Sequence, residues 1–204
     1  LTRSLIVGFS GFKGNFTTEV LVGPGLYQRD ILHGVAIVAT GANEYKPREF
    51  LFGQDERVVT QIELAERLVK DDIDDLDQIV MIQCVGSRNE ENPNCSRVCC
   101  QTAIKNALQI KKLQPEADIY ILYRDIRTYG FMEDYYTEAR RSGILFFPYD
   151  PADPPVAESS ETGVVVSFND QMLGRRIKVR ADILALSAGM VPEDTEEFAS
   201  ILKL

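Results

Sequence analysis

The stretch Ile79-Val-Met-Ile-Gln-Cys-Val-Gly-Ser-Arg88, followed after a polar loop by Cys95-Ser-Arg-Val-Cys-Cys100, sets the interpretation of the whole chain. The apolar run Ile79–Ile82 leads into it and is typical of a buried strand. A helical pattern of apolar residues follows it, made up of Ala103, Ile104, Ala107, Leu108 and Ile110. The stretch therefore places thiols where a strand ends and a helix begins, which is where open α/β sheets bind ligands.

Strands and helices alternate around this stretch. Thr60-Gln-Ile-Glu63 is a capping-box pattern, and Ile62, Ala65 and Leu68 follow at helical spacing. We further predict strands over 78–84, 117–123, 144–148 and 182–189, helices over 96–113 (with Ser96 as N-cap) and 131–142 (ending at Gly143), and a hairpin of strands 164–168 and 175–179. This order predicts an α/β fold, a doubly wound parallel sheet with an attached β-meander.

The first 45 residues differ in pattern. Short strands are expected over 4–9 and 18–22. The apolar run 35–39 predicts a fully buried parallel strand, and Thr40-Gly41 at its carboxyl end lets the backbone turn past a ligand. An ordinary turn is the alternative for these two residues.

Three minor features carry little chemistry. A helix is expected to begin near residue 193, and the acidic run 71–75 is interpreted as a solvated loop rather than a calcium site. His33 precedes a strand and is expected to be structural. Because the sequence contains one histidine, no Ser/His/Asp set is available, and no catalytic residue is predicted.

The charge, the apolar runs and the first residue of the sequence limit the kinds of protein that the chain can be. The net charge of −9 argues against nucleic acid as a partner. No apolar run approaches the length of a membrane span, and the start lacks a signal-peptide pattern, so a cytoplasmic location is expected. The first residue is Leu1 rather than Met, which favours an internal fragment of a longer protein.

All four cysteines lie within the stretch, at Cys84, Cys95, Cys99 and Cys100. Cys95 and Cys99 share one helix face, Cys100 follows, and Cys84 comes from the preceding strand end, so all four can point at one volume. We expect the helix N-terminus, with Arg88 and Arg97 nearby, to lower the thiol pKa values. A [4Fe–4S] cluster is the favoured occupant. A zinc site and a thiol–disulfide redox site remain alternatives.

Two neighbouring features are candidate contacts of a bound redox group. Lys105 lies one turn past Cys100, where a cation would stabilise an anionic reduced form; a solvated lysine is the alternative. The loop 123–129 follows a strand end at the same edge of the sheet as the cysteines. It would meet a flavin or a partner, or Arg124 and Asp125 would simply pair with each other.

Four motifs together resemble the A-subunit of heterodisulfide reductase, an iron–sulfur flavoprotein family with a core like thioredoxin reductase. They are Cys84-Val-Gly-Ser-Arg, Cys95-Ser-Arg-Val-Cys-Cys, Tyr120-Ile-Leu-Tyr-Arg-Asp-Ile-Arg-Thr-Tyr-Gly130 and Val38-Ala-Thr-Gly-Ala42. The cysteine motif is highly specific, whereas Ala-Thr-Gly is common among two-dinucleotide flavoproteins. The resemblance extends from about residue 11 to the end.

The resemblance implies a site and a division of the chain. The four cysteines would ligate a [4Fe–4S] cluster beside FAD, with Thr40, Gly41 and Lys105 as flavin neighbours. Residues 1–45 would be part of an FAD-binding half, 46–192 an NAD(P)-binding-like domain and 193–204 the start of a return to the FAD half.

The resemblance also implies an activity and partners. The intact family protein passes electrons between a hydrogenase or ferredoxin donor, FAD and other heterodisulfide reductase-type subunits. The alternatives are a structural or docking domain with a zinc or disulfide staple, and a dithiol reductase.

The sequence departs from the flavoprotein pattern in two places. The turn after strand 78–84 carries Cys84-Val-Gly-Ser-Arg88 in place of Gly-x-Gly-x-x-Gly, so nicotinamide binding there is not expected. No Gly-x-Gly-x-x-Gly precedes residue 35, so only part of an FAD site is present.

Overall fold

The computed structural model describes residues 1–73, 76–193 and 195–203. The chain forms two compact units, Leu1–Asn43 with Val191–Leu204, and Glu44–Met190. Where the chain passes between them, β4 (Asn43–Glu44) and β13 (Met190–Val191) pair with each other. Each unit is described separately below.

The larger unit is built on a five-stranded sheet in the order β5-β12-β6-β7-β8, with all neighbouring strands parallel. Its strands are β5 (Val58–Thr60), β6 (Gln78–Val85), β7 (Asp118–Tyr123), β8 (Leu145–Pro148) and β12 (Ile183–Ala188). β6 and β12 lie at its centre and are buried along nearly their whole length. A near-continuous apolar run is what a strand covered on both faces requires.

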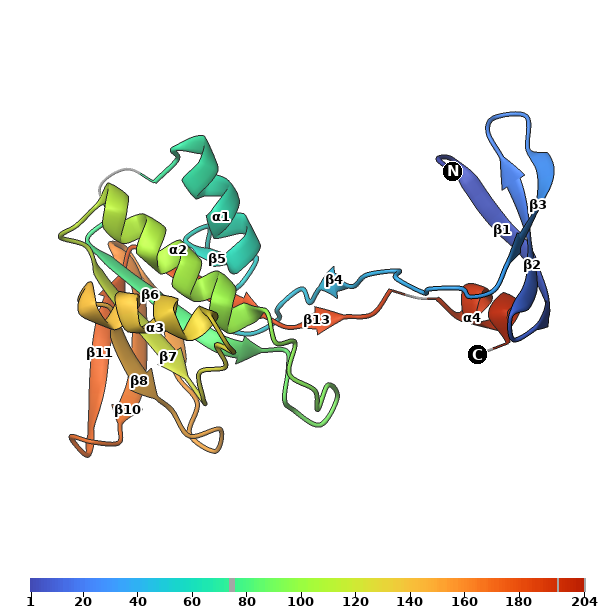
Figure 1. Cartoon of the computed structure of the whole chain (residues 1–204). Helices are drawn as coiled ribbons and strands as arrows, with labels where there is room; N and C mark the ends of the chain where they lie inside the picture. Colours follow the sequence, from blue (N-terminus) through green and yellow to red (C-terminus); the bar gives the residue numbers. More distant parts are fainter. Residues whose placement is uncertain (74–75, 194, 204) are drawn as a thin grey trace. The chain divides into compact units, whose positions relative to one another are not determined.

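Different layers cover the two faces of this sheet. Figure 1 shows α1 (Gln61–Lys70), α2 (Cys99–Leu113) and α3 (Met132–Arg141) together on one face. The antiparallel meander of β9 (Val156–Ser160), β10 (Gly163–Asp170) and β11 (Arg175–Ala181) covers the other. The predicted α/β fold is confirmed, with the meander in the place of a second helical layer.

Alternate residues of the strands feed two separate cores. On β6, Met81 packs beneath the helices, whereas Val80 and Ile82 pack against the meander. Phe168 of β10 is 1% exposed and lies over Phe147 of β8, with the ring centroids 5.1 Å apart. This alternation follows from the two-residue period of a strand.

The predicted helix starts are partly corrected. Thr60 caps α1 through a complete capping box with Glu63, as expected. Ile62 is exposed, however, and the buried face of α1 consists of Gln61, Leu64 and Leu68. The predicted helix 96–113 begins at Cys99 rather than at Ser96, which is not its N-cap.

The smaller unit contains the antiparallel sheet β1 (Ser4–Phe12), β2 (Asn15–Val22) and β3 (Tyr27–His33), with α4 (Glu196–Leu202) packed on β1. His33 is structural here: its Nε2 lies 2.7 Å from Thr18 Oγ1, and its Nδ1 2.9 Å from the carbonyl oxygen of Val35. β3 was not predicted.

The predicted buried strand 35–39 is wrong. In the described part of the chain these residues form no strand, and Ile37 is 88% exposed. An apolar run becomes a buried strand only when other strands bond to its edges and layers cover its faces, and no described strand pairs with this segment. Thr40 and Gly41 lie in the same exposed segment.

Two expectations fall partly on residues outside the described ranges. The acidic run 71–75 includes residues 74–75, and the helix expected from 193 includes residue 194; its described part is α4. Among the described residues, no helix has both the length and the apolar character needed to cross a membrane.

Candidate metal centre

Cys84 projects from an irregularity in the central strand of the sheet. Ile82 pairs with Leu186 of β12, but the next pair is Val85 with Ala188. Gln83 and Cys84 on β6 therefore stand opposite Ser187 alone, which is a β-bulge. Cys84 has a φ of 64°, a left-handed backbone conformation that is uncommon for a residue with a side chain. The bulge thus re-aims a thiol at the carboxyl end of the strand.

Cys99 and Cys100 form the first turn of α2. No described side chain caps this helix, and no acidic residue lies in its first turn, so its N-terminal end keeps a positive potential. The Cys99 thiol donates to the carbonyl oxygen of Ala188 at 3.3 Å, and the Cys100 thiol to that of Asp125 at 3.9 Å. The two adjacent thiols are therefore held against the ends of two different strands, β12 and β7.

Cys95 comes from the loop 86–98 that joins β6 to α2. The N–H of Arg97 donates to Cys95 Sγ at 3.4 Å, and Arg97 itself has a φ of 67°. Ser96 fixes the loop from the other side, because its Oγ accepts a hydrogen bond from the N–H of Met190 at 2.7 Å. Ser96 is thus a tether between the loop and the end of the sheet.

All four cysteines are free thiols and line one pocket. The other residues that line it are Gln83, Ser87, Ser96 and Arg97. Its volume is about 10 Å³, roughly the space of one water molecule. The predicted convergence of Cys84, Cys95, Cys99 and Cys100 is therefore present, in a closed form.

The thiols are not arranged as a single-ion site. Among the residues that the structure describes, no group of three or more His, Cys, Asp or Glu side chains is placed to hold one metal ion. Zinc requires its ligands about 2.3 Å from one centre, whereas a cluster spreads its cysteine ligands over several iron atoms. The donor set, four unpaired thiols with no carboxylate in the pocket lining, has the chemistry that an iron–sulfur cluster needs.

Arginine side chains lie around the pocket. Arg88 Nη1 lies 3.9 Å from Cys84 Sγ and 2.5 Å from Asp125 Oδ1, and Arg127 pairs with the second oxygen of Asp125 at 3.1 Å. Arg124 donates to the backbone carbonyl of Arg88 at 2.8 Å. In the described structure, the pairing of Arg124 with Asp125, one of the two alternatives for this loop, is not found: Asp125 pairs with Arg88 of the loop 86–98 instead.

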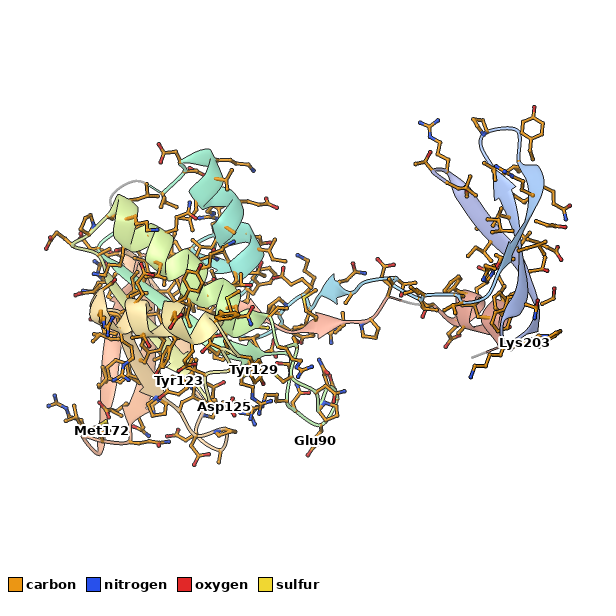
Figure 2. The ribbon with its side chains drawn as sticks, in the orientation of Figure 1. Glu90, Tyr123, Asp125, Tyr129, Met172 and Lys203 are labelled. Carbon is orange, nitrogen blue, oxygen red and sulfur yellow. The ribbon has the colours of Figure 1, made fainter. Side chains whose placement is uncertain are left out.

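An aromatic ring and a carboxylate contact these arginines and Arg97. The Arg97 guanidinium lies over the Tyr129 ring, 5.6 Å from its centroid. Figure 2 shows Asp125 and Tyr129 beyond the end of β7, on the side from which the loop with Glu90 extends. Burial opposes the charge on Asp125, but hydrogen bonds from Arg127 and Arg88 outweigh it and hold the pKa of this carboxyl below its usual range. Asp125 is thus an anionic link between Arg88 and Arg127.

Burial dominates the chemistry of the thiols. It raises the pKa of Cys84 and Cys100, and it raises the pKa of Cys99 to about 11 despite a hydrogen bond from Ser96. The expectation of lowered pKa values is wrong for these three thiols, because removal from water disfavours each thiolate more than its hydrogen bonds and, at Cys84, the nearby arginines favour it. A metal that binds these thiols would therefore have to displace their protons.

Two buried polar residues that the sequence did not single out lie at the bulge. Gln83 and Ser187 are each 1% exposed. Within the described structure, neither atom of the Gln83 amide has a hydrogen-bond partner, nor does Ser187 Oγ. An unpartnered buried polar group costs about 1–3 kcal/mol, so each requires an explanation. The feature of the sequence that could have pointed to Gln83 and Ser187 is that each is a polar residue near the end of an apolar strand.

The remaining predicted site residues lie elsewhere. Lys105 is exposed and lines a groove of about 740 Å³ between α2 and α3. It is absent from the lining of the cysteine pocket. Thr40 and Gly41 belong to the smaller unit. Their contact with a flavin stays a prediction.

Sequence comparison identifies relatives. No family model matches the chain. The A-subunit of the ferredoxin:CoB-CoM heterodisulfide reductase of Methanosarcina acetivorans is 37% identical, over 84% of this chain and 27% of that protein. The iron–sulfur A-subunit of the CoB–CoM heterodisulfide reductase of Methanocaldococcus jannaschii is 34% identical, over 91% and 32%. The chain is a relative of the heterodisulfide reductase A-subunit. The expected resemblance is confirmed, and the chain spans about a third or less of the length of these relatives.

Solved structures share the fold of this chain. The FAD-bound cadaverine monooxygenase DfoA from Erwinia amylovora has a TM-score of 0.56 at 10% identity, over 98% of this chain and 55% of that one. The L-lysine 6-monooxygenase from Pseudomonas syringae has a TM-score of 0.52 at 11% identity, over 98% and 56%. At this identity the likeness concerns the fold alone.

Proposed function

We propose that this chain is the electron-transfer part of a heterodisulfide reductase-type oxidoreductase, with a [4Fe–4S] cluster held by Cys84, Cys95, Cys99 and Cys100. The observation that carries the proposal is the convergence of four free thiols on one pocket at the carboxyl edge of a parallel sheet. The word "iron–sulfur" in the names of relatives supports it. When bound, the cluster supplies reversible one-electron transfer.

The residues of the chain have separable tasks in this proposal. The thiols give up their protons and become ligands. Arg88, held by Asp125, balances the negative charge that the four thiolates bring into a buried site. Because the pocket is closed, the loop 86–98 moves outward on loading, and the bulge at Cys84 keeps the first ligand on the rigid sheet.

FAD and the partners belong to the intact protein in this proposal. Thr40, Gly41 and Lys105 are proposed neighbours of the flavin. Proposed partners are other heterodisulfide reductase-type subunits and a ferredoxin or hydrogenase donor, since relatives carry ferredoxin and H₂ in their names. A cytoplasmic location, where thiols stay reduced, is part of the same proposal.

Anaerobic reconstitution with iron and sulfide tests the ligand assignment. The chain should bind about four irons and four sulfides, develop a broad visible absorption and give a paramagnetic signal on reduction. Cys99→Ala should lose these signals. Met172→Ala, at the exposed tip of the β10–β11 hairpin (Figure 2), should keep them.

Two results would count against the proposal. Retention of about one zinc with no iron would favour a structural staple. A reversible two-electron thiol–disulfide couple in the iron-free chain, with activity of the full-length protein dependent on it, would favour a dithiol reductase.

A further inference from the structure

Among the residues that the structure describes, Gln83 has a buried side-chain amide with no hydrogen-bond partner at the wall of the cysteine pocket. It is 1% exposed, and it lines the pocket together with the four thiols. Neither Nε2 nor Oε1 has a hydrogen-bond partner in the described structure. A leucine or methionine would fill similar space at no such cost, so the amide calls for a role in the state in which the pocket is filled.

The backbone around Gln83 is fixed, so its side chain has a defined place. The Tyr149 hydroxyl donates to the Gln83 carbonyl oxygen at 2.7 Å. Gln83 and Cys84 together form the bulge opposite Ser187. Since side chains alternate along β6, Gln83 lies on the face of Met81, beneath the helices and the first turn of α2.

The Gln83 amide can supply hydrogen-bond donors to the sulfur atoms in the pocket. Gln83 Nε2 offers two N–H groups, and thiolate or sulfide sulfur accepts hydrogen bonds. Two of the sulfurs already have donors: the Arg88 guanidinium reaches Cys84, and the backbone N–H of Arg97 reaches Cys95. Cys99 and Cys100 are themselves donors to backbone carbonyls while they are thiols. Once they lose their protons, new acceptors arise next to an unused donor.

We propose that Gln83 donates a side-chain N–H hydrogen bond to a sulfur of the bound cluster or of its ligands, and thereby raises the reduction potential of the cluster. The inference rests on the proposed function, because it needs a cluster in the pocket. Hydrogen bonds to cluster sulfurs stabilise the more negative, reduced form.

The test compares redox titrations of the anaerobically reconstituted chain, followed by visible absorption and electron paramagnetic resonance. Gln83→Leu and Gln83→Met remove the donor and keep the bulk. Each should still bind iron, but at a fixed ambient potential its ratio of reduced to oxidised cluster should fall about tenfold, the effect expected for one lost charge-assisted hydrogen bond. Gln109→Leu, on the α2–α3 groove, is the matched control and should leave the ratio unchanged.

Stability of the iron-free chain gives a second, independent readout. Gln83→Leu and Gln83→Met should raise its melting temperature, since they remove an unpartnered buried amide. A loaded Leu or Met variant with the wild-type potential and spectrum would overturn the inference and leave the proposed function intact. Absence of iron from the wild-type chain as well would overturn the proposed function, and the inference with it.

Discussion

At the scale of single residues, three strained backbone positions lie in the segment that carries the thiols. Cys84, Arg88 and Arg97 all have a positive φ, between 57° and 67°, within the segment that carries the proposed ligands. Each such residue costs about 1–3 kcal/mol unless its surroundings compensate. Here the compensation comes from Asp125, which pairs with Arg88, and from Ser96, which tethers the loop to Met190.

Arg88→Met tests the charge balance of the site. The substitution keeps much of the side-chain bulk but removes the cation beside Cys84, so the cluster should still form and should be lost to a chelator roughly 10–100-fold faster. Iron release followed by visible absorption measures this. Arg141→Met, an exposed position in the last turn of α3, should match the wild type. Equal release rates for Arg88→Met and the wild type would remove Arg88 from the site.

Asp55 belongs to a group of hydrogen bonds in a different part of the larger unit. Its carboxylate accepts hydrogen bonds from Arg57 at 2.7 and 2.8 Å and from Ser159 at 2.7 Å, and Arg57 also donates to the carbonyl oxygen of Ser160. These hydrogen bonds connect the segment that precedes β5 to β9. The hydrogen bonds from Arg57 hold the pKa of Asp55 well below its usual range.

Asp55→Asn should therefore lower the free energy of unfolding by about 1.5–3 kcal/mol at pH 7. Because the folded-state pKa is depressed, this stability is present above the unfolded pKa of about 3.9 and is lost as the pH falls below it. Urea titrations at pH 7 and at acidic pH should show the difference shrinking. Glu158→Gln, exposed on β9, should show neither effect, and a pH-independent Asp55→Asn difference would refute the charge argument.

At the scale of elements, the loop 86–98 is the part of the site that the proposed function requires to move. Most of its residues from 89 to 94 are exposed, whereas both of its ends are attached to rigid elements, β6 and α2. A cluster that binds Cys84 and Cys95 would join the loop to the sheet. Its binding free energy would then hold the loop in its loaded position.

Limited proteolysis measures that coupling. Trypsin should cut the iron-free chain after Arg97 or Arg88, and reconstitution should slow this cleavage about tenfold or more, equivalent to about 1.4 kcal/mol of loop stabilisation. Cleavage at other exposed sites, such as Lys112, serves as the internal control. An unchanged rate at the loop would place the cluster elsewhere.

At the scale of the whole molecule, the larger unit contains everything the proposed cluster site needs. All four cysteines, the arginines around them and both apolar cores lie within Glu44–Met190. We expect this segment, produced alone, to melt cooperatively and to bind the cluster with the same spectrum as the whole chain. Circular dichroism and iron analysis check both points. An unfolded segment, or one that folds but takes no iron, would show that the smaller unit is required.

The sequence by itself determined the local features of this protein. Thr60 with Glu63 predicted the start of α1, Gly143 the end of α3, and the cysteine spacing predicted four thiols around one volume. The two helix ends depend on residues within a few positions of one another, and the four cysteines all lie between residues 84 and 100.

Tertiary structure decided the rest, because burial and pairing depend on residues far apart in the chain. It left the run 35–39 exposed for want of described partner strands. It raised the thiol pKa of Cys99 by enclosing it. It also paired Arg88 with Asp125 across two loops and buried the Gln83 amide beside the thiols with no partner among the described residues. Spacing alone encodes none of these, since each results from how separate strands and loops meet at the end of the sheet.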